Sequence, residues 1–153
     1  MFRHYNPNEI GVEAIIDFLT RCSSEYPDEV GNVDLKEWPE KMNRFADAFC
    51  YLDEHGTISA AIFFYCNDLK NKTAYVTFFC SLHGTPKGTA YQLHKNYLDY
   101  SKTKGMFFSR LEVLKNNAHA RAFYERQGYR AIEDHGKKDL LLLELTKTEE
   151  SHD

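Results

Sequence analysis

The chain has 153 residues, of which 42% are hydrophobic and 14% aromatic. A chain of this length buries roughly 70% of the surface that it exposes when unfolded, so it can build a substantial core. Its 19 basic and 23 acidic residues give a formal net charge of −4, which argues against non-specific nucleic-acid binding because such binding needs a basic face. We predict a single domain over residues 1–148 and a frayed, charged tail over residues 149–153.

The four cysteines are far apart and form no C-x-x-C pair, which predicts free thiols in a reducing, cytoplasmic setting. The seven histidines lack the spacing of metal ligands, so no metal is expected. No signal-peptide pattern opens the chain, and no apolar run is long enough to cross a bilayer. These features predict a protein that does not associate with membranes.

The first helix is predicted to begin at Asn6, with Pro7 in its first turn and Glu9 three residues after this cap. The apolar residues that follow share one helix face, and they are Ile10, Ala14, Ile15, Phe18 and Leu19. The pattern breaks over residues 23–32. A second short helix is predicted over residues 34–45, although Pro39 lies inside it.

Three apolar segments then predict an antiparallel meander, with the first two joined by a tight turn into a hairpin. These strands are expected over residues 48–52, 57–66 and 73–82. Residues 60–65 are apolar on both faces, which is typical of a strand in the middle of a covered sheet.

Helices and strands alternate in the second half, which indicates an α/β core. The expected elements are a helix over residues 89–104, a strand over 107–114, a helix over 118–127 and a strand over 140–145. Gly105 and Gly128 are placed to stop the two helices.

The segment 82–90 joins a strand to a helix, and a helix N-terminus attracts phosphate through its unpaired N–H groups and partial positive charge. Gly84 and Gly88 allow the backbone to approach a ligand closely, and Lys87 adds a cation. The segment therefore predicts a phosphate-binding loop, with an ordinary strand–helix connection as the alternative.

Residues 111–129 read Leu-Glu-Val, then Asn-x-x-Ala-x-x-Phe-Tyr-Glu, then Gly-Tyr. This stretch resembles the C-terminal signature of the GNAT family of acyl-CoA-dependent N-acetyltransferases. Within that family it is most similar to the enzymes that acetylate the N-terminal alanine of a ribosomal protein. The resemblance extends over roughly residues 57–145.

The resemblance implies an α/β GNAT fold, with a central, mixed, mostly antiparallel sheet and helices on both faces. It implies that the strands 73–82 and 107–114 run parallel and splay apart. It also implies that acetyl-CoA is the cosubstrate of a direct transfer to a primary amine, carried by a small molecule or a peptide. Acetyl and longer acyl donors, and a monomer and a homodimer, remain open.

In the family the phosphate loop reads Arg/Gln-x-x-Gly-x-Gly/Ala, whereas this chain has Thr85-x-x-Gly88-x-Ala90. Thr85 thus departs from the pattern, while the glycine and the small residue match it. The resemblance implies that the cosubstrate is contacted by Phe79, Cys80, Ser81, Gly84, Thr85, Lys87, Gly88, Thr89, Ala90, Asn117, Ala120 and Phe123.

Some of these residues have a second interpretation. Asn117 or Asn116 is expected to cap the helix that follows, and Phe123 is expected to pack in the core. Cys80 as a covalent nucleophile is disfavoured because the sequence places no histidine and acid beside it.

Two residues are the candidates for catalysis. The resemblance implies that Glu112 removes a proton from the amine, directly or through a water; the alternative is an outward-facing strand residue in an ion pair. Tyr124 shares a helix face with Ala120 and Phe123 and is expected beside the leaving sulfur, or else as a core tyrosine. A phenol has a higher pKa than a thiol, so complete proton transfer is uphill by roughly 2 kcal/mol and we expect hydrogen-bond donation.

Residues 25–40 are acidic, and Lys36 is their only base. The acidic residues are Glu25, Asp28, Glu29, Asp34, Glu37 and Glu40. They predict a rim that attracts a cationic acceptor, with Tyr26, Trp38 and Tyr51 as candidate aromatic walls. The alternative is a solvated acidic loop. A rival function is a catalytically weak, GNAT-like module that binds acyl-CoA or regulates a partner.

Overall fold

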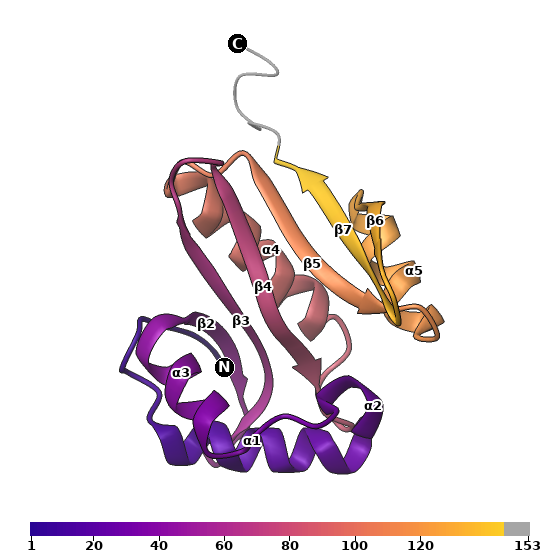
Figure 1. The fold of residues 1–153 in the computed structure, drawn as a ribbon. Helices are drawn as coiled ribbons and strands as arrows, with labels where there is room; N and C mark the ends of the chain where they lie inside the picture. Colours follow the sequence, from indigo (N-terminus) through magenta and orange to yellow (C-terminus); the bar gives the residue numbers. More distant parts are fainter. Residues whose placement is uncertain (146–153) are drawn as a thin grey trace. The chain divides into compact units, whose positions relative to one another are not determined.

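The computed structural model describes residues 1–145 (Figure 1). Its elements are β1 (Phe2–Tyr5), α1 (Val12–Glu25), α2 (Pro27–Val30), α3 (Glu37–Phe45), β2 (Asp47–Leu52), β3 (Ile58–Asp68), β4 (Thr73–Ser81), α4 (Thr89–Thr103), β5 (Phe108–Leu114), α5 (Ala118–Gln127), β6 (Arg130–His135) and β7 (Lys138–Glu144). The predicted frayed tail, 149–153, lies outside the described residues. Within residues 1–145, no helix has both the length and the apolar character needed to cross a membrane.

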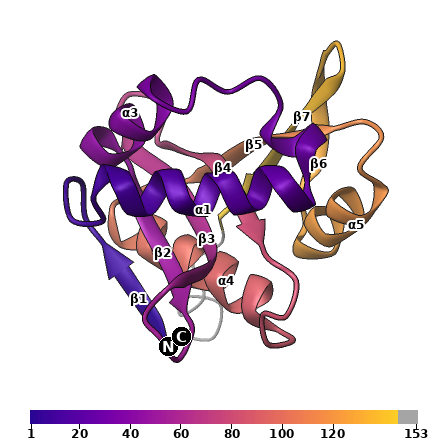
Figure 2. The same ribbon diagram turned by 90° about the horizontal axis from the view of Figure 1, so that it is seen from below.

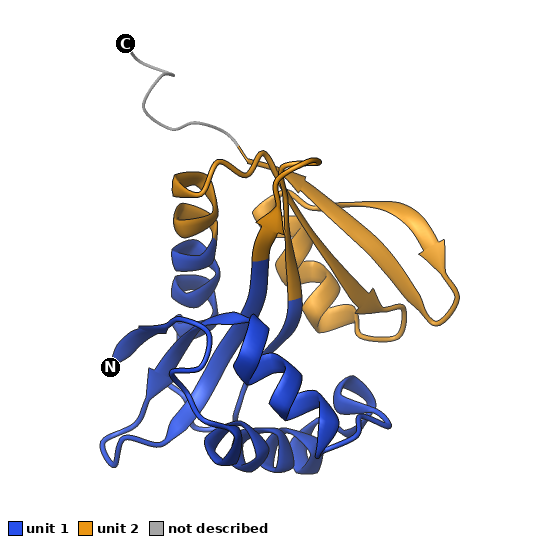
Figure 3. Ribbon diagram, turned by 60° about the vertical axis from the view of Figure 1, so that its left-hand side comes forward, with its two compact units in different colours: residues 1–65, 77–97 blue, residues 66–76, 98–153 orange. Residues whose placement is uncertain are grey.

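The chain divides into two compact units, which Figure 3 colours separately. Unit 1 comprises residues 1–65 and 77–97, and unit 2 comprises residues 66–76 and 98–153. Three elements, β3, β4 and α4, contribute residues to both units, so the single domain predicted for residues 1–148 stays a prediction.

The strands follow the order β1-β2-β3-β4-β5-β7-β6 in one seven-stranded sheet. Within unit 2, β4 runs parallel to β5, joining Thr73–Tyr75 to Phe108–Arg110. The pairs β1–β2, β2–β3, β5–β7 and β6–β7 are antiparallel. The predicted α/β class and the mixed, mostly antiparallel sheet with one parallel pair are therefore confirmed.

Unit 1 buries both faces of its strands, as the apolar run 60–65 predicts. On one face Phe18 of α1 packs edge-on against Phe78 of β4, with ring centroids 6.3 Å apart. On the other face Phe64 of β3 meets Tyr97 of α4 at 4.8 Å. Figure 2 shows α1 and the first turns of α4 on opposite sides of these strands. The alternating direction of neighbouring strand residues thus supplies both cores.

Unit 2 is built on β5. This strand pairs with β7 from Phe108↔Glu144 to Leu114↔Lys138, and β7 pairs in turn with β6. Ser109 and Leu111, which share one face of β5, are buried. The Ser109 hydroxyl lies 2.7 Å from the Tyr129 hydroxyl just after α5, so this is the face that α5 covers.

The predicted start of the first helix is wrong. The chain forms strand β1, paired with β2, and then a turn in which the Asn6 N–H donates to Glu9 Oε1 at 2.8 Å. Helix α1 begins at Val12, after Gly11 with φ 97°. The Asn-Pro-x-Glu pattern therefore closes a turn instead of capping a helix. Ala14, expected on the apolar face, is exposed.

The second predicted helix begins three residues late, at Glu37. Asp34 Oδ1 accepts the N–H groups of Lys36 (2.8 Å) and Glu37 (3.0 Å) and so organises the approach to α3. Pro39 falls in the first turn, where a missing N–H removes no helical hydrogen bond. The pattern also missed α2, β1 and β6.

Buried His94 gives a prediction on pH-dependent stability. This α4 side chain lies against the Phe79 and Tyr97 rings, and burial lowers its pKa to about 4. The unfolded chain binds a proton below about pH 6.5, so this residue makes the fold less stable as the pH falls from about 6.5 towards 4. The expected contribution at pH 5 is a loss of about 2 kcal/mol relative to pH 7.

The variant His94→Phe should remove most of this contribution. The measurement is the free energy of unfolding in urea at pH 7 and pH 5. The difference between the two pH values should be smaller in the variant by about 2 kcal/mol. Equal losses in the natural chain and the variant would contradict the assignment.

Candidate active site

The loop between β4 and α4 lies in unit 1 and is folded by its own hydrogen bonds. The Thr85 hydroxyl lies 2.7 Å from the carbonyl of Leu82 and 3.1 Å from that of Ser59, and the Thr85 N–H also donates to Leu82. The buried Thr89 hydroxyl donates to the Pro86 carbonyl at 2.6 Å. Both threonine side chains are therefore turned into the loop.

The start of α4 has backbone N–H groups that can donate hydrogen bonds to a ligand. Within residues 1–145, the N–H groups of Gly88, Ala90 and Tyr91 make no hydrogen bond. Gly88 has φ 90°, and a Cβ added there would meet nothing within 4 Å, so the loop is open beside it. Lys87 is exposed. Unpaired amides, a helix N-terminus and a cation are the features that hold phosphate oxygens.

The loop also borders a cavity of about 590 Å³ within unit 1. This cavity lies among the end of α1, the β2–β3 turn and the loop, and its lining includes Arg21, Glu25, Tyr51, Glu54, His83 and Gly84. The sequence pattern did not connect Arg21 or Glu54 with the loop. Their distance along the chain leaves no local signal.

The end of β4 is held from the α1 side. The Tyr26 hydroxyl donates to the Ser81 carbonyl at 3.0 Å, and Glu25 accepts the His83 N–H at 2.8 Å. The Cys80 thiol is buried, and its hydrogen bond with Cys22 and its burial raise its pKa well above the usual range. Cys80 is thus held as a neutral thiol, which agrees with its rejection as a nucleophile.

The acidic rim, Glu25 to Glu40, is exposed at all six carboxylates. Two of them accept hydrogen bonds from nearby backbone amides. Glu25 accepts the His83 N–H, and Asp34 accepts the amides at the start of α3, which lower the pKa of Asp34. The aromatic residues are less available than expected. Trp38 packs edge-on against Phe78 at 5.4 Å in the apolar core, and Tyr26 is bound to Ser81.

The candidate phenol lies in unit 2, on α5. Asn117 Oδ1 accepts the Ala120 N–H at 3.0 Å, so Asn117 rather than Asn116 caps this helix. Tyr124 is buried, and its ring lies edge-on to those of Phe123 and Tyr129, each at 5.6 Å. The predicted core contacts of Phe123 and Tyr124 are both present in this aromatic cluster.

Glu112 has a partner that the sequence did not reveal. His135 Nδ1, on β6, lies 2.5 Å from Glu112 Oε2, and the two side chains are 34% and 30% exposed. The predicted alternative for Glu112, an outward-facing strand residue in an ion pair, is therefore present. Among residues 1–145, no group of three or more His, Cys, Asp or Glu side chains is arranged to hold a metal ion.

β6 was missed because all six of its residues are exposed, so it lacks an apolar alternation. The one available signal is Gly136, which stands between Ile132 and the leucines of β7 and reads as a hairpin turn. A hairpin at that point would have placed His135 near the neighbouring strands.

The chain belongs to the acetyltransferase (GNAT) family, whose model matches residues 12–129. It is thus an acyl-CoA-dependent acetyltransferase by family. The predicted family resemblance is confirmed. No curated protein sequence matches the chain.

Solved structures share the fold. The acetyltransferase of the GNAT family from Staphylococcus aureus Mu50 has a TM-score of 0.74 at 14% identity, covering 95% of this chain and 100% of that chain. The ribosomal-protein-S18-alanine N-acetyltransferase from Escherichia coli has a TM-score of 0.72 at 16% identity, covering 98% and 97%. An aminoglycoside 6'-N-acetyltransferase complexed with coenzyme A has a TM-score of 0.73 at 13% identity, covering 96% and 98%. At these identities the likeness shows the fold alone.

Proposed function

We propose that this acetyltransferase moves an acetyl group from acetyl-CoA to a primary amine by direct attack, without an acyl-enzyme. One observation carries the proposal: Gly88, Ala90 and Tyr91 have unpaired amides at the start of α4, in a chain that matches the acetyltransferase family. Three such amides suit the pyrophosphate of coenzyme A.

The phosphate site is proposed to consist mainly of backbone. Thr85 replaces the Arg or Gln of the family pattern, and its hydroxyl is engaged with Leu82 and Ser59 inside the loop. We infer that Thr85 and Thr89 shape the loop, while Gly84, Lys87 and Gly88 with the following amides meet the phosphates. The pantetheine arm is assigned to Phe79, Cys80, Ser81, Asn117, Ala120 and Phe123.

In the proposed reaction the amine nitrogen forms a bond to the acetyl carbon as the carbon–sulfur bond breaks. The amine loses one proton, and the departing thiolate takes up one proton from solvent after the carbon–sulfur bond has broken. Glu112 is proposed to receive the amine proton, directly or through a water, and Tyr124 to donate a hydrogen bond to the developing sulfur charge.

The alternation of β5 supports this division of roles. Ser109 and Leu111 lie on the face of β5 that α5 covers, and Glu112 lies on the other face. Tyr124, on α5, therefore belongs to the opposite face of β5 from Glu112. In acyl transfer the nucleophile and the leaving group also sit on different sides of the carbonyl carbon, so two separate groups are needed.

The acceptor is proposed to be a cationic amine, from a small molecule or a peptide. The support is the exposed acidic rim, which has one base among six carboxylates. The rival reading, an acyl-CoA-binding module of low activity, keeps the loop but assigns no turnover to Tyr124. Acetyl-CoA titration followed by thiol release with a panel of amines separates the two readings, because a binding module gives heat of binding without free thiol.

Tyr124→Phe should lower kcat about 100-fold and change the Kd for acetyl-CoA by less than about twofold, because it removes a hydrogen bond formed with the leaving sulfur. The measurement is free thiol released in the presence of the best amine of the panel, with calorimetry for the Kd.

The matched control is Tyr129→Phe. Tyr129 is a buried tyrosine whose hydroxyl bonds Ser109, so its loss should reduce the free energy of unfolding by about 1 kcal/mol and leave kcat nearly unchanged. A fully active Tyr124→Phe enzyme would remove Tyr124 from the mechanism.

Gly88→Ala should weaken acetyl-CoA binding at least about tenfold, because its Cβ would project into the open side of the loop and the αL backbone would be strained. Gly136→Ala is the control, since Gly136 has φ 83° and also no neighbour within 4 Å of an added Cβ. Both variants should lose about 1 kcal/mol of stability, but calorimetry should detect weaker binding only in Gly88→Ala. Equal affinities would rule out the loop as the phosphate site.

Reversing two rim charges, Asp28→Lys with Glu40→Lys, should raise the apparent KM for a cationic amine about tenfold. The control pair, Glu13→Lys with Glu144→Lys, changes the net charge equally at exposed positions outside the rim. Steady-state kinetics at low salt make the comparison. If both pairs raise KM equally, net charge and not the rim attracts the acceptor.

A further inference from the structure

The proposed base, Glu112, is the end of a three-residue chain on one face of unit 2. His135 Nδ1 lies 2.5 Å from Glu112 Oε2, and its other ring nitrogen, Nε2, lies 2.8 Å from Glu133 Oε1. Glu112 comes from β5, and the other two residues come from β6, two strands away. The imidazole therefore reaches across β7 to the carboxylate.

This geometry favours the protonated form of the His135 ring. Each ring nitrogen faces a carboxylate oxygen, and an ionised carboxylate can only accept. Two hydrogen bonds to ionised carboxylates need both ring nitrogens to donate, which is the imidazolium form. In agreement, the hydrogen bond with Glu112 and then that with Glu133 raise the pKa of His135 above its ordinary value. Both observations favour the protonated ring between the two carboxyl groups.

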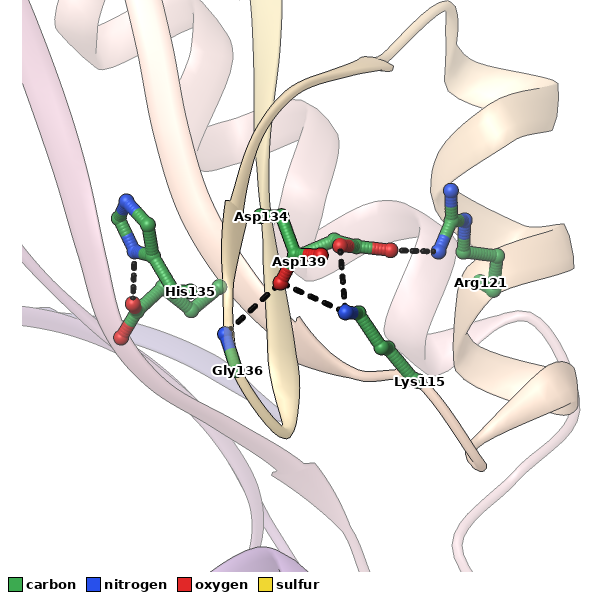
Figure 4. Close-up of polar contacts among 7 residues, drawn as sticks. Lys115, Arg121, Asp134, His135, Gly136 and Asp139 are labelled. Atoms are coloured by element: carbon green, nitrogen blue, oxygen red, sulfur yellow. Dashed lines mark hydrogen bonds and ion pairs between the residues drawn. The ribbon is translucent and has the colours of Figure 1, made fainter.

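The strand turn behind His135 is fixed from the opposite side. Asp134 Oδ1 accepts the Gly136 N–H at 2.8 Å and pairs with Lys115 Nζ at 2.6 Å. Asp139 pairs with Arg121 of α5 at 2.7 Å. Figure 4 shows His135 on one side of the β6–β7 hairpin and these ion pairs on the other. Asp134 and Gly136, the two neighbours of His135, are therefore fixed by these contacts. They fix the backbone position from which the His135 side chain extends.

The hydrogen bonding leaves one oxygen of the proposed base available. Glu112 Oε2 is engaged by His135, and within residues 1–145 Glu112 Oε1 has no hydrogen-bond partner. By strand alternation Arg110 and Lys138 share this face of unit 2, and Lys138 pairs in register with His135. Neither is hydrogen-bonded to Glu112. The arrangement fixes the carboxylate at one oxygen and presents the other.

We propose that His135, held by Glu133, is a positioning residue that fixes the Glu112 carboxylate and leaves Oε1 for the acceptor amine or its water. The inference rests on the proposed function, in which Glu112 receives the amine proton. His135 contributes no proton to the reaction. It acts through Glu112, by setting the direction of the carboxylate and keeping a positive charge beside it.

The geometric part is tested without any activity measurement, by following the His135 ring through a pH titration with NMR. The midpoint in the full chain should lie above about 6.5, and both Glu133→Gln and Glu112→Gln should lower it. The exposed His55 of the β2–β3 turn is the internal control, and its midpoint should not change. A His135 midpoint that neither variant moves overturns the proposal.

The functional part is tested by a double-mutant comparison. His135→Gln should lower kcat about tenfold and leave the Kd for acetyl-CoA unchanged. Glu112→Gln should lower kcat about 100-fold, and adding His135→Gln to it should cause no further loss. The control His55→Gln should leave kcat unchanged in both backgrounds.

The outcomes separate this inference from the proposed function. If the natural chain binds no acetyl-CoA and releases no thiol with any amine, the proposed function fails. If the natural chain is active but His135→Gln is fully active, or slows the reaction equally with and without Glu112, the positioning role fails alone. A His135→Gln chain that does not fold is recognised by thermal shift, and Glu133→Gln then takes its place in the same comparison.

Discussion

Strand β5 is the constraint on which unit 2 depends, because it is hydrogen-bonded to two different neighbouring strands. It pairs in parallel with the start of β4 and antiparallel with β7 over its whole length. A strand paired on both edges cannot shift its register without exposing its apolar face. The register therefore fixes Glu112 on one face, and it fixes where the strand ends and Asn117 begins α5. Both proposed catalytic residues take their places from this one strand.

The phosphate loop illustrates a site made from backbone more than from side chains. The family pattern has Arg or Gln where this chain has Thr85. The threonine instead binds Leu82 and Ser59. The donors proposed for phosphate are amides, which every sequence supplies wherever the loop and the helix keep their shape. Thr85 thus contributes hydrogen bonds inside the loop.

The sequence predicted the elements whose signal is local and strong. Buried strands with apolar runs and helices stopped by glycine were found to within a few residues. The missed strands, β1 and β6, are at the edges of the sheet, where one or both faces meet solvent and polar residues replace the alternation. The start of α1 failed because Asn6 and Glu9 pair within a turn, and the same residue types serve both turns and caps.

The limit of local sequence patterns is clearer still at the candidate site. Motifs gave the positions of Glu112, Tyr124 and the loop, because each belongs to a short pattern of neighbouring residues in the sequence. They could not give the partners of these residues, which come from distant parts of the chain. His135 is 23 residues from Glu112, and Tyr26 is 55 residues from Ser81. Such pairs follow from strand order and register, which no local pattern contains.

The contact between His135 and Glu112 affects how the Glu112 carboxylate can act as a base. Free carboxyl and free alkylammonium groups differ by about six pKa units, so complete proton transfer between them is uphill by roughly 8 kcal/mol. An imidazolium beside the carboxylate does not reduce that difference. In the proposed reaction the carboxylate therefore works on an amine that loses its proton as the carbon–nitrogen bond forms, when the nitrogen becomes far more acidic. Orientation of the carboxylate then matters more than its proton affinity, and orientation is what a rigid ring bound at Oε2 supplies.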